Sequence, residues 1–86
     1  MTYRIRIERA AGKAFDALRP ATKQRVAAAI DTLAENPRHF GVIKMTGSSD
    51  GYRLRVGDYR VVFTIDDAAA LVSIVRIASR QGAYRK

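Results

Sequence analysis

The sequence predicts one small α+β domain, and three observations lead to that prediction. The chain has 86 residues, of which 48% are apolar and 28% charged, a composition typical of a folded globular protein. Before Pro37 the apolar residues recur mainly at helical spacing, whereas after it they alternate with polar residues as in strands. A chain this short supports one hydrophobic core, so residues 1–86 are expected to form a single domain.

The first half predicts a strand followed by two helices. Tyr3 to Ile7 alternates apolar and basic residues, as a half-exposed strand does. A short helix follows and is expected to end at Pro20, where a longer helix begins and continues to Asn36 and Pro37. The apolar stripes are Ala11, Ala14, Phe15 and Leu18 in the first helix and Val26, Ile30 and Leu33 in the second. Together they form a helical hairpin whose apolar stripes need a sheet to cover them.

The second half predicts four strands of a mostly antiparallel sheet. The expected strands are Gly41 to Thr46, Tyr52 to Val56, Tyr59 to Ile65 and Leu71 to Ile77. Loops or turns are expected at Gly47 to Gly51, at Gly57 and Asp58, and at Asp66 to Ala69. Glycine in the first place of the Gly57–Asp58 pair favours a type II′ hairpin turn. The last strand is apolar on both faces, which is typical of a central strand.

A two-residue turn fixes which residues of the hairpin lie opposite each other. Val56 then faces Tyr59, and Arg55 faces Arg60. One face carries Tyr52, Leu54, Val56, Tyr59, Val61 and Phe63, and the other carries Arg53, Arg55 and Arg60. Like charges directly opposite each other destabilise a sheet by roughly 0.2–1 kcal/mol. The face that carries these three arginines therefore predicts an anionic ligand. The alternatives are that the arginines pair with acids elsewhere in the protein or that they are simply hydrated.

The overall charge also indicates an anionic partner. The chain has 16 Lys and Arg against 8 Asp and Glu, a net charge of +8, and 12 of the 16 are arginine, whose planar fork matches phosphate oxygens. A nucleic acid or an acidic protein fits this charge, and a solvated basic surface is the alternative. A second basic cluster ends the chain and consists of Arg76, Arg80, Arg85 and Lys86, with Tyr84 among them. Tyr84 is expected either to stack on a base or transfer a proton, or to lie flat on the domain.

Several classes of protein are not expected from this sequence. The chain has no cysteine and a single histidine, His39, so disulfides are excluded and neither a metal site nor a cofactor is expected. The amino terminus lacks the apolar run of a signal peptide, and no stretch of 18 apolar residues occurs. We therefore expect a cytoplasmic protein with no membrane partner.

Three segments of the chain carry a resemblance to a known family. Lys44 to Gly47, the block GYRLRVGDYRVVF at Gly51 to Phe63, and the terminal SRQGAYRK resemble the RelE branch of the RelE/ParE toxin superfamily. The resemblance spans nearly the whole chain and implies the RelE-like order β-α-α-β-β-β-β. It also implies a toxin that cleaves messenger RNA in the ribosomal A site through metal-free attack of a ribose 2′-OH. Such a toxin is neutralised by an antitoxin encoded beside it, which the basic face here predicts to be acidic.

The resemblance also assigns roles to individual residues. Arg53 and Arg55 take the positions that grip the scissile phosphate, and Arg60 the position that stabilises the pentacoordinate charge. Arg80 lies near the position that stabilises the leaving group, and Tyr84 takes the position that helps to activate the 2′-OH. The remaining basic residues expected to bind RNA are Lys44, Arg76, Arg85 and Lys86.

Three positions depart from the family pattern. Several relatives have lysines where this chain has Arg53 and Arg55, and many have a histidine where it has Ser79. Since arginine does not lose its proton near neutral pH, cleavage is expected to be slower or to rest mainly on electrostatics. His39 is predicted to be a capping or surface residue rather than a replacement. Two other hypotheses remain: a ParE-like toxin that inhibits DNA gyrase, and a basic binding module without catalysis.

Overall fold

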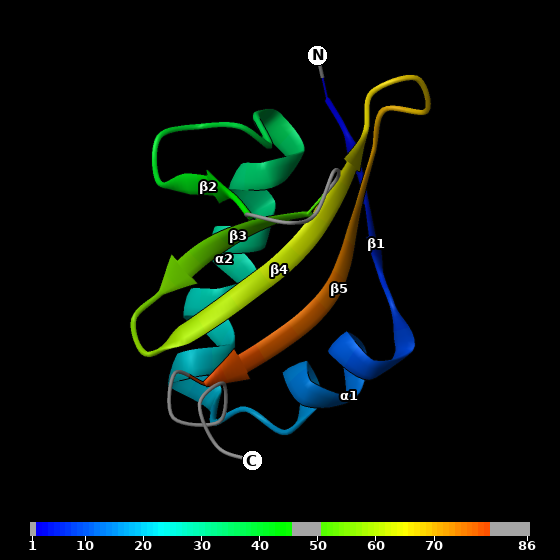
Figure 1. The fold of residues 1–86 in the computed structure, drawn as a ribbon. Helices are drawn as coiled ribbons and strands as arrows, with labels where there is room; N and C mark the ends of the chain where they lie inside the picture. The colour runs from blue at the N-terminus through cyan, green and yellow to red at the C-terminus, as the bar shows by residue number, and fades with distance from the viewer. Residues whose placement is uncertain (1, 46–50, 80–86) are drawn as a thin grey trace.

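A five-stranded sheet forms the centre of the molecule, and both helices cover one of its faces (Figure 1). The computed structural model describes residues 2–45 and 51–79. Along the chain the elements are β1 (Arg4–Ile7), α1 (Arg9–Asp16), α2 (Pro20–Glu35), β2 (Val42–Lys44), β3 (Gly51–Val56), β4 (Tyr59–Asp66) and β5 (Leu71–Ser79). The strand order in the sheet is β1-β5-β4-β3-β2. The predicted α+β class and order of elements are confirmed.

The amino-terminal strand adds a parallel edge to the sheet. β1 pairs with β5 from Arg4 opposite Leu71 to Ile7 opposite Ile74, whereas all other neighbouring strands are antiparallel. The sheet therefore has five strands rather than the four expected for its carboxy-terminal part. β5 has a neighbour on each side, as its apolar character predicts.

The two helices begin and end close to the predicted positions. Pro20 starts α2, and Asn36 follows its last residue and donates its backbone N–H to the Thr32 carbonyl. The prediction placed the end of the first helix at Pro20, whereas α1 ends at Asp16. Figure 1 shows α1 beside the start of α2 and below β5. Neither helix has the length and apolar character that crossing a membrane requires.

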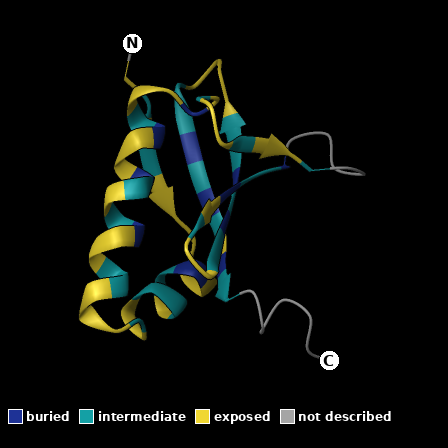
Figure 2. Ribbon diagram, turned by 90° about the vertical axis from the view of Figure 1, so that its left-hand side faces the viewer, coloured by how far each residue is buried: buried dark blue, intermediate teal, exposed yellow. Residues whose placement is uncertain are grey.

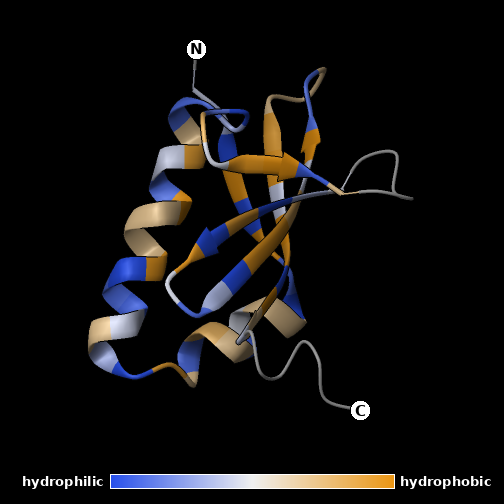
Figure 3. Cartoon of the chain, turned by 60° about the vertical axis from the view of Figure 1, so that its left-hand side comes forward, coloured by the Kyte–Doolittle hydropathy of each residue, from blue (hydrophilic) through white to orange (hydrophobic). Residues whose placement is uncertain are grey.

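The hydrophobic core lies between the helices and the sheet. Its buried residues are Ala11, Val26, Ile30, Leu33, Leu54, Val61, Phe63, Val72, Ile74 and Ile77. α2 turns its buried residues toward the sheet and its exposed residues outward (Figure 2). Hydrophobic and hydrophilic residues alternate along β3 and β4, as half-covered strands require (Figure 3). No helix among residues 2–45 and 51–79 lies over the other face of the sheet.

β2 is shorter than predicted. It covers Val42–Lys44 rather than Gly41 to Thr46. Gly41 has a φ of +106°, which is outside the range of strand residues, so the strand begins one residue later. Beyond β2, Met45 donates its backbone N–H to the Gly51 carbonyl at 2.9 Å. The predicted loop from Gly47 to Gly51 falls mostly outside the described residues.

An ionic network ties three segments together where β4 turns into β5. Asp67 accepts hydrogen bonds from both terminal nitrogens of Arg38 at 2.9 Å and from the Tyr3 hydroxyl at 2.7 Å. The Arg38 guanidinium also lies over the Tyr52 ring, 5.6 Å from its centre. The hydrogen bonds from Arg38 and then Tyr3 lower the pKa of Asp67 to about 2, and the hydrogen bond to Asp67 raises the pKa of Tyr3. The network therefore joins the amino terminus, the segment after α2 and the β4–β5 turn.

Candidate functional site

The β3–β4 hairpin has the predicted register. Val56 lies opposite Tyr59, Arg55 opposite Arg60, and Arg53 opposite Val62. Because directly opposite residues in an antiparallel pair project to the same side, all three arginines share one face. The other face of the hairpin packs on the core through Leu54 and residues of β4. The arginines are therefore on the face of the sheet that the helices leave uncovered.

The turn that fixes this register has the predicted geometry. Gly57 has a φ of +59°, whereas Asp58 is not among the residues with positive φ, and this combination is that of a type II′ turn. α2 contributes an arginine here that the sequence did not indicate. A Cβ atom placed on Gly57 would lie 3.0 Å from a terminal nitrogen of Arg25, so this guanidinium contacts the turn from the helix side.

β5 adds a fourth arginine to the same face. Arg76 lies opposite Val62, which in turn lies opposite Arg53, so the three residues form one row across three strands. Arg55 and Arg76 are exposed, and Arg53 and Arg60 are half-buried. The four residues Arg53, Arg55, Arg60 and Arg76 are called the arginine face from here on.

The electrostatics of the arginine face favour an anion. Among residues 2–45 and 51–79, the salt bridge found joins Arg38 to Asp67, and no carboxylate pairs with Arg53, Arg55 or Arg76. Asp58 lies in the turn and is exposed. The guanidinium groups of Arg53, Arg55 and Arg76 have no carboxylate partner among the described residues, and a phosphate would supply a counter-charge with charge-assisted hydrogen bonds. The alternative of ion pairs to acids elsewhere thus finds no support for these three residues.

Lys44 lies beside the arginine face rather than on it. It pairs with Tyr52, so its place in the register is on the helix side of the sheet. At the edge of the sheet, however, Ile43, Lys44, Met45 and Arg53 line a shallow depression of about 260 Å³. Lys44 can thus reach an anion that enters from this edge.

The terminal basic cluster lies only in part within the described residues. Arg76 is on β5, whereas Arg80, Tyr84, Arg85 and Lys86 lie outside the described residues. Ser79 pairs with Tyr59, and Ala78 pairs with Arg60, so β5 ends beside the β3–β4 turn. The last described residue of β5 thus lies next to the arginine face.

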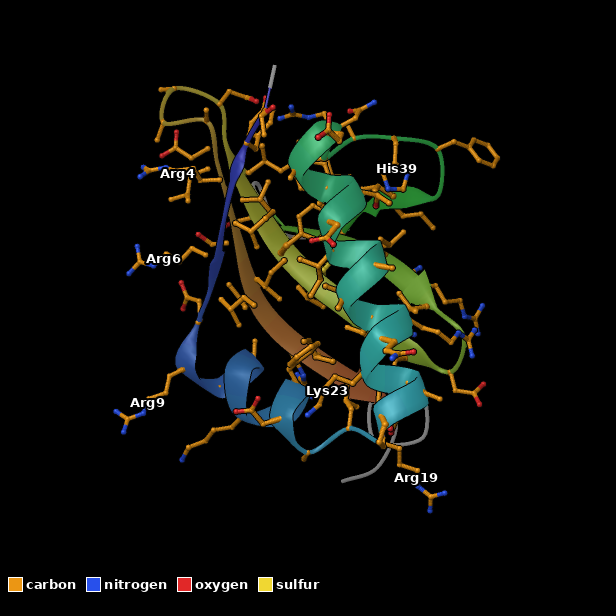
Figure 4. The ribbon with its side chains drawn as sticks, turned by 180° about the vertical axis from the view of Figure 1, so that it is seen from behind. Arg4, Arg6, Arg9, Arg19, Lys23 and His39 are labelled. Carbon is orange, nitrogen blue, oxygen red and sulfur yellow. The ribbon has the colours of Figure 1, made fainter. Side chains whose placement is uncertain are left out.

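His39 has the structural role that was predicted. Its Nε2 lies 2.9 Å from the Thr32 hydroxyl on α2, and its Nδ1 lies 2.7 Å from the Phe40 carbonyl. The ring therefore joins the segment after α2 to the end of that helix (Figure 4). Within the described part of the chain, no three His, Asp or Glu side chains come together in a way that could hold a metal ion.

Sequence comparison finds toxins of toxin–antitoxin systems. Residues 5–84 match the family model described as the ParE toxin of type II toxin-antitoxin system, parDE. RelE1 of Methanocaldococcus jannaschii is 28% identical over 88 residues, which cover 99% of this chain and 98% of that protein. The toxin RelE of Mycobacterium tuberculosis is 40% identical over 53 residues, which cover 62% of this chain and 55% of that protein.

Solved structures of RelE proteins have the same fold. RelE in the archaeal RelE–RelB complex from Pyrococcus horikoshii superposes with a TM-score of 0.79 and 34% identity, covering 93% of this chain and 97% of that one. The isolated E. coli RelE toxin superposes with a TM-score of 0.81 at 20% identity, covering 90% of this chain and 83% of that one. The fold and the family resemblance thus agree.

Proposed function

Because the chain belongs to the ParE toxin family of type II toxin–antitoxin systems, and to the RelE-like branch of its superfamily, we propose that it is a toxin that cleaves ribosome-bound messenger RNA. The observation that supports cleavage most is the pair Arg55 and Arg60, opposite each other on the uncovered face of the sheet. Arg53 and Arg76 flank the pair on the same face. Four guanidinium groups are well suited to a phosphate whose charge increases during reaction.

The reaction proposed is transfer of the phosphate within the RNA backbone. The ribose 2′-oxygen attacks the adjacent phosphorus, the bond to the 5′-oxygen of the next nucleotide breaks, and a 2′,3′-cyclic phosphate remains. The 2′-OH loses a proton and the departing 5′-oxygen gains one. Arginine remains protonated at neutral pH, so Arg53, Arg55 and Arg60 act by holding the phosphate and stabilising its added negative charge. Proton transfer then falls to groups other than arginine, and the family resemblance gives Tyr84 a part in activating the 2′-OH. The same resemblance places Arg80 near the leaving oxygen, whose negative charge it stabilises.

The cognate partner proposed is an acidic antitoxin. Solved relatives include RelE–RelB complexes from Pyrococcus horikoshii and from other organisms, which supports an antitoxin partner for this chain. A net charge of +8 and an arginine face with few acids favour a partner of opposite charge. An acidic segment laid over the arginine face would neutralise it and exclude RNA at the same time.

An Arg60→Ala variant tests the proposed cleavage. Loss of one donor to the phosphorane is expected to reduce cleavage about 10²-fold or more. Cells that express Arg60→Ala should therefore grow, whereas cells that express the control Arg19→Ala, which removes the same charge from the exposed link before α2, should not. Circular dichroism verifies that both variants fold. Equal toxicity of Arg60→Ala and wild-type protein would refute the proposal.

A translating extract identifies the target. Primer extension on a reporter message should show breaks at ribosome-occupied codons. DNA gyrase in the same preparation should supercoil normally. Inhibited supercoiling with an intact message would instead support the ParE-like alternative. This alternative is tested because the family that matches the chain is described as the ParE toxin family.

A further inference from the structure

The parallel pairing of β1 places two more arginines on the uncovered face. Arg6 lies opposite Ser73 of β5, which lies opposite Thr64 of β4. Arg4 lies opposite Leu71 in the next row. The residues between and after these arginines, Ile5 and Ile7, face the helices and line an apolar depression with residues of α1 and α2. Arg4 and Arg6 therefore project to the side that the arginine face occupies.

The row that contains Arg6 has the chemistry of a phosphate subsite. Thr64 and Ser73 are half-buried hydroxyl residues, and Arg6 beyond them is exposed. Within the described residues, neither the two hydroxyls nor the Arg6 guanidinium has a hydrogen bond or ion pair with another side chain. Hydroxyl and guanidinium donors are the side-chain groups that commonly bind phosphate oxygens of nucleic acids. We call Thr64, Ser73 and Arg6 the β1 row.

Arg6 shares its row with two hydroxyl side chains, whereas Arg4 shares its row with an acid. Asp66 of β4 shares the Arg4 row, because Asp66 lies opposite Leu71 and Leu71 lies opposite Arg4. This carboxylate accepts a hydrogen bond from the Ala69 backbone N–H, and its charge reduces the positive potential near Arg4. The β1 row itself has no acidic residue, and Glu8, which follows Arg6 by two residues and is exposed, forms no ion pair with it among the described residues. Figure 4 shows Arg4, Arg6 and Arg9 projecting from β1 and from the start of α1, away from α2.

We propose that the β1 row binds a backbone phosphate of single-stranded RNA, separate from the phosphate held at the arginine face. The choice of RNA rests on the proposed function. Neighbouring strands are about 4.8 Å apart, so Arg6 on β1 is roughly 10 Å from the strand of Arg60 and roughly 14 Å from that of Arg55. This spacing places Arg6 at a different nucleotide from the one that is cleaved. The β1 row thus holds the substrate on one side of the reacting bond.

The composition of the β1 row favours RNA over an acidic protein. Protein interfaces have an apolar centre in which aromatic residues are enriched. The β1 row has two short hydroxyl side chains and one arginine, with no aromatic or large aliphatic group among them. Arginine and hydroxyl donors without an apolar anchor match a sugar-phosphate backbone, which offers oxygens at regular intervals.

Binding of RNA of two lengths tests the proposal. Fully 2′-O-methylated single strands of two and ten nucleotides lack the attacking 2′-OH, so binding is measured without cleavage. Arg6→Ala should weaken binding of the ten-nucleotide strand several-fold and reduce the slope of log Kd against log salt by about 0.7, the value for one phosphate contact on a single strand. Binding of the dinucleotide, whose single internal phosphate occupies the arginine face, should not change. Arg6→Lys should retain the slope, and Ser73→Ala should weaken only the longer strand.

Arg19→Ala is the matched control, because Arg19 is exposed at the far end of α2 from β1 (Figure 4). If Arg6→Ala and Arg19→Ala bind the ten-nucleotide strand equally well, the β1 row is refuted, even where messages are still cleaved. If Arg6→Ala weakens an acidic antitoxin peptide but not RNA, the row binds protein and the proposal is likewise refuted. If Arg6 affects RNA binding while no message is cleaved, the β1 row is supported and the proposed cleavage fails.

Discussion

Replacement of Gly57 by alanine tests whether the turn determines the hairpin. Gly57 has a φ of +59° as the first central residue of a type II′ turn, a conformation that a residue with a Cβ atom adopts at a cost of about 1–2 kcal/mol. The added Cβ would also lie 3.0 Å from a terminal nitrogen of Arg25. That nitrogen is the end of a flexible side chain, so it can move aside at little cost. Gly57→Ala should therefore destabilise the protein by about 1–2 kcal/mol in total, and lower Tm by roughly 4–16 °C for a domain of this size.

Thermal unfolding followed by circular dichroism measures this effect. Asp58→Ala is the matched control, because it changes the neighbouring residue of the same turn, where φ is not positive. It should change the free energy of unfolding by no more than about 0.5 kcal/mol. In the Arg25→Ala background Gly57→Ala should cost nearly as much as in the wild type, since the backbone carries most of the penalty. A Gly57→Ala variant as stable as Asp58→Ala would refute the reasoning.

Four further predictions concern stability and partners. Arg55→Thr should raise the free energy of unfolding by about 0.2–1 kcal/mol because it removes a like charge opposite Arg60, and it should also lower RNA cleavage. If urea unfolding shows that the variant is less stable than the wild type, this prediction is wrong. Phe63→Ala should cost about 3–5 kcal/mol by leaving a cavity in the core, and a loss below 1 kcal/mol in the same assay would be inconsistent with its burial. The pKa of Asp67 is lowered from 3.8 to about 2, so its ion pair stabilises the fold above pH 4 and this stabilisation is lost as the pH falls toward 2. The difference in Tm between wild type and Asp67→Asn should therefore shrink between pH 4 and pH 2, and it should not change near neutral pH. The association rate with an acidic antitoxin should fall steeply with added salt in stopped-flow mixing, and a rate indifferent to salt would exclude electrostatic steering.

The sequence predicted the hairpin in detail because its geometry is local. The two-residue turn fixes the register, and once Val56 faces Tyr59 the position of Arg55 opposite Arg60 follows from the alternation of side chains. The same locality explains why α2 could be placed between Pro20 and Asn36. These features depend on residues that are close in the chain, and no knowledge of the tertiary structure is needed.

Two features that the sequence did not predict depend on contacts between distant segments. Parallel pairing of β1 with β5 joins residues about 67 positions apart, as Arg4 and Leu71 show, and strand alternation alone does not identify the partner. Arg25 reaches Gly57 only because α2 crosses the hairpin, and nothing in the sequence around Arg25 indicates this contact. The roles expected of Arg80 and Tyr84 stay predictions, since both residues lie outside the described part of the chain.

The hairpin can keep like charges opposite each other because its two faces differ in energetic weight. Full burial of a side chain such as Val61 or Leu54 on the core face contributes about 1.5–3 kcal/mol, whereas the opposition of Arg55 and Arg60 costs roughly 0.2–1 kcal/mol. Burial on one face therefore exceeds repulsion on the other, and the register is stable without an acidic partner for Arg55. An anion that binds between the two arginines removes the repulsion and adds charge-assisted hydrogen bonds, so it is favoured most where its negative charge is greatest. In the proposed reaction that point is the pentacoordinate phosphate, which is why the pair should bind the transition state more tightly than the uncleaved RNA.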